Sequence, residues 1–81
     1  MRPNTWNSPI TIENTETGVR RTVRSVRQAK AMLDRYWSVY HGSQYHRAEK
    51  VCDDVLHGDA APTKARQAFI AAAVEAHLRL S

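Results

Sequence analysis

The residues of this 81-residue chain that could bind a metal ion lie in its middle third. Asp53 and His57 are four residues apart, so on a helix both side chains could reach one ion. His41 and His46 are close in sequence, but the single cysteine, Cys52, falls on the apolar side of the same helix. A zinc site needs several convergent nitrogen or sulfur ligands. Because these residues do not converge, we predict no metal ion and no other cofactor, with histidines at the surface and a buried thiol.

The sequence also lacks the pairings that catalysis requires. A thiol in apolar surroundings has a raised pKa and reacts poorly, which argues against a Cys52–histidine catalytic pair. The three glycines are widely separated, so they form no phosphate-binding loop. An enzyme with a cleft near Tyr45 and His46 is the least favoured alternative, because nothing there pairs a nucleophile with a base. We therefore predict no catalytic residues and a protein that is not an enzyme.

A basic segment offers a second kind of chemistry. No acidic residue occurs between Glu16 and Asp34. The basic residues in this interval that could form one positive surface are Arg20, Arg21, Arg24, Arg27 and Lys30. Arginine side chains suit phosphate oxygens, and the net charge of +4 favours anionic partners, nucleic acid among them. The competing interpretation, which we prefer, is a solvated strand face that discourages edge aggregation, since no nucleic-acid motif accompanies the charges.

The elements that position these residues begin with a predicted hairpin. Residues 1–8 are expected to form a flexible arm anchored by Trp6, and residues 9–81 a single domain. Residues 10–13 alternate apolar and polar side chains, as a half-buried strand does. A turn ending at Gly18 leads into a returning strand over residues 19–24. Arg21 is on the valine face of that strand, so we expect its apolar stem near a strand edge and its guanidinium in water.

Three helices are predicted after the hairpin. Ser25 and Gln28 form a capping box, which starts a helix from Val26 to about Trp37. A second helix runs from Gln44 to about Leu56 and is followed by Gly58, a typical helix-ending residue. A third begins near Pro62, where the missing N–H costs nothing, and its pattern extends to Leu80. The predicted fold class is α+β, a two-stranded antiparallel hairpin followed by three helices.

The third predicted helix is apolar on two opposite faces. One face carries Ala65, Ala68, Phe69, Ala72, Ala73, Ala76 and Leu80. The other carries Ile70, Ala71, Val74 and Leu78. An ordinary surface helix has one apolar stripe, and a hairpin with two short helices offers little cover for a second. We therefore predict that the second face is the interface of a homodimer, with C2 symmetry as the commonest solution. The alternative is that both faces are buried within the domain.

Length and hydropathy restrict the protein further. A chain of 81 residues makes one small domain of marginal stability. No apolar run approaches the roughly 20 residues needed to span a bilayer, so no membrane association is predicted. The first residues lack the apolar region of a signal peptide, and one free thiol suits a reducing compartment, so a cytoplasmic location is expected.

Several short blocks recur in the order and spacing of a known family. The most distinctive is residues 65–73, ARQAFIAAA, followed by Glu75-Ala76. The others are Trp6 with Pro9-Ile10, Gly18-Val19-Arg20-Arg21, Ala29 with Leu33 and Trp37, Gly42 with Tyr45 and Ala48, and Cys52 with Leu56 and Gly58. With these blocks the chain resembles the domain-of-unknown-function 982 family of small uncharacterised bacterial proteins. The resemblance implies a single α+β domain in bacteria, with no established activity and no catalytic residues to carry over.

Together these observations predict a non-enzymatic protein-interaction module that self-associates through the last helix or the hairpin edge. A nucleic-acid-associated regulator that uses the basic hairpin surface is the alternative.

Overall fold

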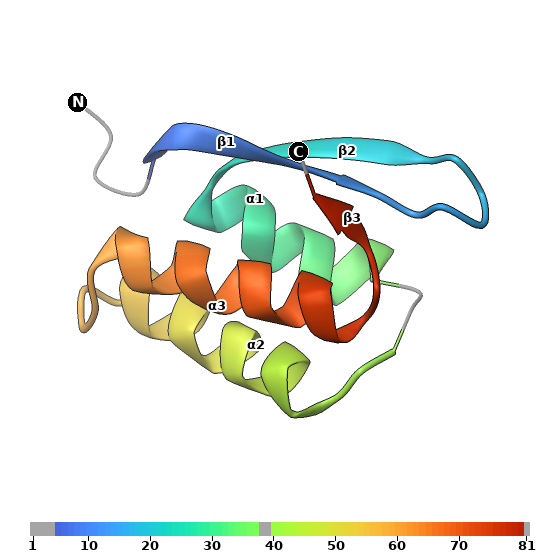
Figure 1. Ribbon diagram of the computed structural model, residues 1–81. Helices are drawn as coiled ribbons and strands as arrows, with labels where there is room; N and C mark the ends of the chain where they lie inside the picture. Colours follow the sequence, from blue (N-terminus) through green and yellow to red (C-terminus); the bar gives the residue numbers. More distant parts are fainter. Residues whose placement is uncertain (1–4, 38–39, 81) are drawn as a thin grey trace.

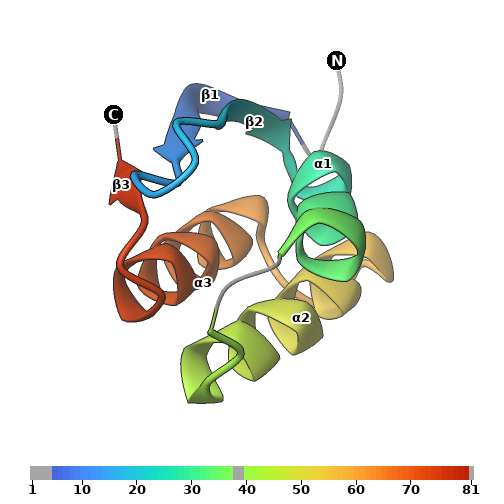
Figure 2. The same cartoon turned by 90° about the vertical axis from the view of Figure 1, so that its right-hand side faces the viewer.

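The computed structural model describes residues 5–37 and 40–80. Figure 1 shows its elements in chain order: β1 (Thr5–Glu13), β2 (Arg20–Ser25), α1 (Val26–Ala31), the π-helix η1 (Met32–Tyr36), α2 (Ser43–Leu56), α3 (Pro62–Glu75) and β3 (Arg79–Leu80). The sheet forms one layer and the helices lie beneath it, with α1 and α3 nearer to the sheet than α2 (Figure 2). No helix in the described ranges is long and apolar enough to cross a membrane.

The sheet has three strands in the order β2-β1-β3, and both pairings are antiparallel. The α+β class is therefore confirmed, but the predicted two-stranded hairpin is only part of the sheet. β1 begins at Thr5, earlier than the strand predicted from Ile10, so residues 5–8 belong to the sheet rather than to an arm. Residues 1–4 lie outside the described part of the chain. The pairing of β1 with β2 is irregular between Thr5 and Ile10, a segment that contains Pro9.

Aromatic side chains form the centre of the core between the sheet and the helices. The Phe69 ring lies 6.2 Å from the Trp6 ring and 5.7 Å from the Trp37 ring, measured between centroids. The Trp6 indole N–H also donates a hydrogen bond to the Pro62 carbonyl (3.1 Å). Because this contact ties the start of β1 to the start of α3, Trp6 anchors the segment that the sequence marked as an arm.

The predicted capping box is present at the start of α1. The Gln28 N–H donates to Ser25 Oγ (3.2 Å), and the Arg24 N–H donates to Gln28 Oε1 (2.6 Å). The helix covers the predicted range, but its winding widens into η1 from Met32 onward. Such π-turns are rare and are frequent at functional sites.

The start of α2 is capped from another helix. Gly42 is the N-cap residue and has no side chain to accept a hydrogen bond. Glu75 of α3 replaces it, because its carboxylate accepts from the Gln44 N–H (3.0 Å), the Tyr45 N–H (3.3 Å) and the Ser43 hydroxyl (3.3 Å). A Cβ atom at position 42 would lie 2.6 Å from this carboxylate, so a larger residue there would force the Glu75 side chain to move.

α3 ends at Glu75, five residues before the predicted end at Leu80. His77 adopts a positive φ of 60°, and the chain then reverses into β3, which pairs Leu80 with Ile12. This stop could not be predicted because the left-handed position carries histidine, whereas the left-handed position after α2 carries Gly58, with φ 84°.

Two hydrogen bonds close the end of α3 in a Schellman motif. The His77 N–H donates to the Val74 carbonyl (3.1 Å), and the Leu78 N–H donates to the Ala73 carbonyl (2.9 Å). This turn directs Leu78 back towards the core, where it is partly buried.

Candidate interaction surface

The first apolar face of α3 is buried, as predicted. The fully or nearly buried residues are Ala65, Ala68, Phe69, Ala72, Ala73 and Ala76. Alanine lets neighbouring backbones approach closely, and α3 packs between α2, α1 and the sheet (Figure 2). Leu80 was assigned to this face, but it lies in β3 instead.

The second predicted face is divided by the structure. Leu78 follows the Schellman turn and lines a hollow beneath the hairpin, so it is not on the helix at all. Ala71 is half-buried and lines a shallow depression with residues of α2. Ile70 is half-buried against the core, and Val74 is 60% exposed. Of the four predicted interface residues, only Ile70 and Val74 therefore remain on an outward surface of α3.

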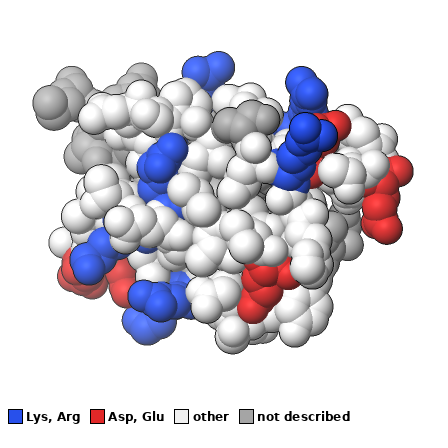
Figure 3. All heavy atoms as spheres, viewed as in Figure 1, with Lys and Arg blue, Asp and Glu red and all other residues white. Residues whose placement is uncertain are grey.

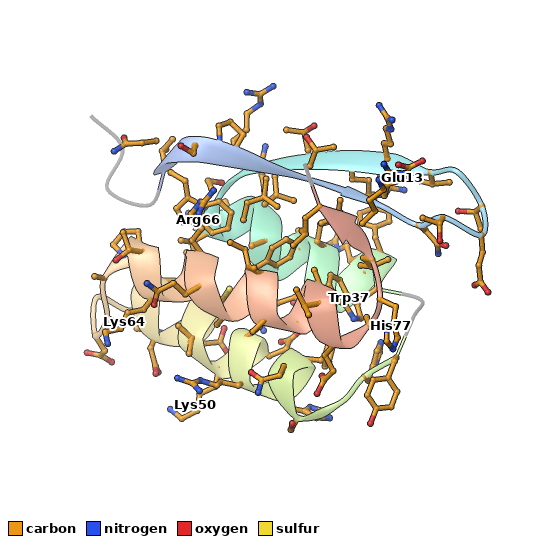
Figure 4. The ribbon with its side chains drawn as sticks, in the orientation of Figure 1. Glu13, Trp37, Lys50, Lys64, Arg66 and His77 are labelled. Carbon is orange, nitrogen blue, oxygen red and sulfur yellow. The ribbon has the colours of Figure 1, made fainter. Side chains whose placement is uncertain are left out.

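We define the outer flank as Ile70, Val74 and the outer edge of β3. In Figures 1 and 2, β3 lies beside the C-terminal end of α3, on the same side of the molecule. Figure 3 shows that the middle of this side is uncharged, with charged residues around its rim. Lys50, Lys64 and Arg66 lie towards the end where α3 begins (Figure 4). Because β3 is the last strand in the sheet order, its outer edge has no partner strand among the described residues.

The five predicted basic residues do not form one surface. Arg20 lies 3.6 Å from Glu13 in an ion pair on β1. Thr22, two residues on, pairs its hydroxyl with Thr11 on that side of the sheet (3.1 Å). Arg21 points to the helix side instead, with its guanidinium 4.2 Å from the centre of the Tyr36 ring. The predicted position of Arg21 on the valine face of its strand is thus confirmed.

The other three basic residues of this set differ in their surroundings. Arg24 and Arg27 are exposed. Lys30 faces α2, where its ammonium group forms ion pairs with Glu49, Asp34 (3.4 Å) and Asp53 (3.4 Å). Its positive charge is therefore balanced within the domain.

The lysine–acid cluster (Lys30, Asp34, Glu49 and Asp53) joins α1 and η1 to α2. Burial raises the pKa of Glu49, and the neighbouring Asp34 carboxylate adds to that rise. The interaction with Glu49, together with the charge of Lys30, lowers the pKa of Asp34. Desolvation alone would lower the pKa of Lys30, but its hydrogen bond to Glu49 and the three nearby carboxylates raise it overall. Glu49 Oε2 is buried and has no hydrogen-bond partner within residues 5–37 and 40–80.

The Cys52 thiol and the His41 and His57 rings pack within α2 or against it. Cys52 is fully buried, as predicted, and burial raises the pKa of its thiol to about 12. His57 Nδ1 lies 2.7 Å from the Asp53 carbonyl at the end of α2. The His41 ring stacks on Tyr45 at 4.0 Å, and its Nε2 lies 2.6 Å from the Trp37 carbonyl. In the described part of the chain, no three His, Cys, Asp or Glu side chains are grouped to hold a metal ion.

Two features of the structure were not predicted from the sequence. One is the role of Glu75, whose carboxylate caps α2 across the fold. The other is the hollow beneath the hairpin, which combines residues from position 12 to position 78. A glycine at the N-cap position of α2, where Ser, Thr, Asp or Asn is usual, was the one local sign that the cap comes from elsewhere.

A protein-family model described as "Protein of unknown function (DUF982)" matches residues 8–80. Comparisons with curated proteins and with solved structures found no match.

Proposed function

Since the chain belongs to the DUF982 family, whose description assigns no activity, we propose that it is a non-enzymatic protein-interaction module that self-associates through the outer flank. The observation that carries this proposal is Val74. It is 60% exposed near the C-terminal end of a helix whose opposite face is buried. An exposed apolar side chain beside a half-buried isoleucine and an uncharged surface is typical of an interface (Figure 3).

A second copy of this chain is the occupant that fits the flank best. A twofold arrangement would bring the open β3 edges together as antiparallel neighbours, and C2 dimers are the commonest homo-oligomers.

The nucleic-acid alternative receives less support from the arrangement of the charges. Arg20 and Lys30 are paired with acidic groups, and Arg21 is stacked on Tyr36. Arg24 and Arg27 remain exposed, with neither a carboxylate partner nor an aromatic ring against them among the described residues. We retain a bacterial, cytoplasmic setting as part of the proposal, on the family resemblance and on the free thiol of Cys52.

Sedimentation equilibrium across a wide concentration range tests the proposal. We expect a dimer for the native sequence and a folded monomer for Val74→Asp, because a buried charge at the interface would be unpaired. Circular dichroism verifies that the variant is folded, which is expected since Val74 is largely exposed in the monomer.

Val19→Asp is the matched control, because Val19 is also an exposed valine (48%) but lies at the hairpin turn. It should leave the dimer intact. A monomer at every concentration would refute self-association, and a dimer that Val74→Asp leaves unchanged would exclude the outer flank as its interface.

A further inference from the structure

A hollow of about 330 Å³ opens between the hairpin, η1 and the turn after α3. The residues that line it are Ile12, Asn14, Thr17, Val19, Arg21, Met32, Arg35, Tyr36, Trp37 and Leu78. Ligand pockets are commonly about 300–1,000 Å³, so this hollow suits a small molecule. The hollow is separate from the outer flank, because neither Ile70 nor Val74 is among the described residues that line it.

The inner wall of the hollow is apolar. Ile12, Met32 and Trp37 are buried residues of the core and present their surfaces to it. In Figure 4, Glu13 of β1 lies at the level of the sheet and Trp37 lies below it, at the level of the helices. At the opening, Val19 and Tyr36 leave large apolar surfaces in water, with Tyr36 52% exposed. Such surfaces would gain from burial under a flat apolar ligand.

The two charged residues among the described lining of the hollow are both basic. Arg21 and Arg35 line it, and none of the lining residues in the described part of the chain is acidic. Neither guanidinium takes part in a salt bridge within residues 5–37 and 40–80, although Arg20 and Lys30 both do. Arg21 lies over the face of the Tyr36 ring, a position that fixes the plane of the guanidinium. A guanidinium fork binds a carboxylate with two parallel hydrogen bonds.

The π-helix η1 explains how these groups come together. It contributes Met32, Arg35 and Tyr36 to the lining, and Trp37 follows directly. Asp34, the neighbour of Arg35, contacts Lys30 instead. Asp34 is therefore turned towards Lys30, and it is not among the described residues that line the hollow.

We propose that this hollow binds a small aromatic carboxylate. Its ring lies against Met32, Trp37 and Leu78, and its carboxylate is held by Arg21 and Arg35 at the opening. The apolar wall calls for a flat hydrocarbon body, and the two arginines without acidic partners call for a single anionic group. The proposal does not depend on self-association.

Titration of the full chain with 2-naphthoate, followed by NMR of the Trp37 indole and the Met32 methyl group, tests this. A ligand of this size is expected to bind with a Kd of about 1 mM. The neutral isostere 2-naphthamide should bind about tenfold more weakly, and inorganic phosphate should not shift the Met32 methyl signal. Arg21→Gln and Arg35→Gln should each weaken naphthoate binding about tenfold.

Arg24→Gln is the matched control, since it removes the same charge from the same strand at an exposed position that does not line the hollow. It should leave the Kd unchanged. The proposal is overturned if naphthoate produces no shift at 10-fold above the expected Kd (about 10 mM). It is equally overturned if naphthamide binds as well, or if the two arginine variants bind as the native chain does. Sedimentation of the same samples shows whether the oligomeric state responds, which separates this result from the test of the outer flank.

Discussion

Asp34 and Arg35 are neighbours in the same π-turn, yet they belong to two opposite kinds of site. Asp34 belongs to the lysine–acid cluster, where its carboxylate and those of Glu49 and Asp53 surround the ammonium group of Lys30. Arg35 lines the hollow together with Arg21, and none of the described residues that line it is acidic. The two sites lie one residue apart along the chain.

The difference shows how to separate structural charge from charge that is available to a partner. A cluster in which acids surround one lysine contributes to holding helices together, and removing the lysine leaves the desolvated carboxylates without a compensating charge. Arginines with no acidic partner beside an open apolar hollow add little to the fold, so their variants should affect binding rather than stability. The following variants test this difference between the two sites, in order of decreasing expected effect on stability.

Replacing Lys30 by Met should have the largest effect. The variant leaves three carboxylates together at a helix–helix contact with no cation, and we expect the free energy of unfolding to fall by about 2 kcal/mol. Urea denaturation at neutral pH measures it. Lys50→Met is the matched control, since Lys50 pairs with Asp54 at the surface and should change stability by less than about 0.5 kcal/mol. Equal effects of the two variants would contradict a structural role for the cluster.

Glu49→Gln should have a smaller effect that depends on pH. The pKa of Glu49 is raised above its ordinary 4.5, so the folded state keeps a proton that the unfolded state has already lost. The stability of the native sequence therefore declines as pH rises from about 4.5 through the higher folded value. Glutamine cannot ionise, and its amide can still accept from Lys30 and donate to Asp34.

The difference in unfolding free energy between Glu49→Gln and the native chain should therefore be near zero at pH 4 and favour the variant at pH 7. Chemical denaturation at a series of pH values measures this difference. Glu16→Gln, in the exposed hairpin turn, is the control for the loss of one negative charge. A difference that stays constant with pH would show that Glu49 does not carry the raised pKa.

Arg21→Gln should change stability least. The variant loses only the contact of the guanidinium with the Tyr36 ring, which is worth about 0.5 kcal/mol at an exposed site. Thermal unfolding should therefore be nearly unchanged, in contrast to the weaker naphthoate binding expected of the same variant. A loss comparable to that of Lys30→Met would mean that Arg21 serves the fold and not a ligand.

Much of the local structure could be predicted from short stretches of sequence. Ser25 and Gln28 gave the start of α1, Gly58 gave the end of α2, and the alternation around Ile10 gave part of β1. The apolar periodicity also placed Cys52 and Phe69 in the core. These features depend on residues within one or two turns of each other. The interactions that cause them can therefore be predicted from a short stretch of sequence.

The remaining features were decided by contacts between distant segments. The helix predicted to Leu80 ends at Glu75, because His77 takes a left-handed conformation and β3 gains a pairing with β1. Glu75 caps a helix some thirty residues earlier in the chain, as its hydrogen bonds to Gln44 and Tyr45 show.

The candidate sites show the same division between local and distant causes. The spacing of apolar residues was enough to predict that Arg21 lies on the valine face and that one side of α3 is buried. Only the tertiary structure decided that Arg21 meets Tyr36, that Lys30 is balanced by acids of α2, and that Leu78 lines a hollow. The physical reason is that periodicity fixes which way a side chain faces, whereas what it meets depends on segments packed beside it from elsewhere in the chain.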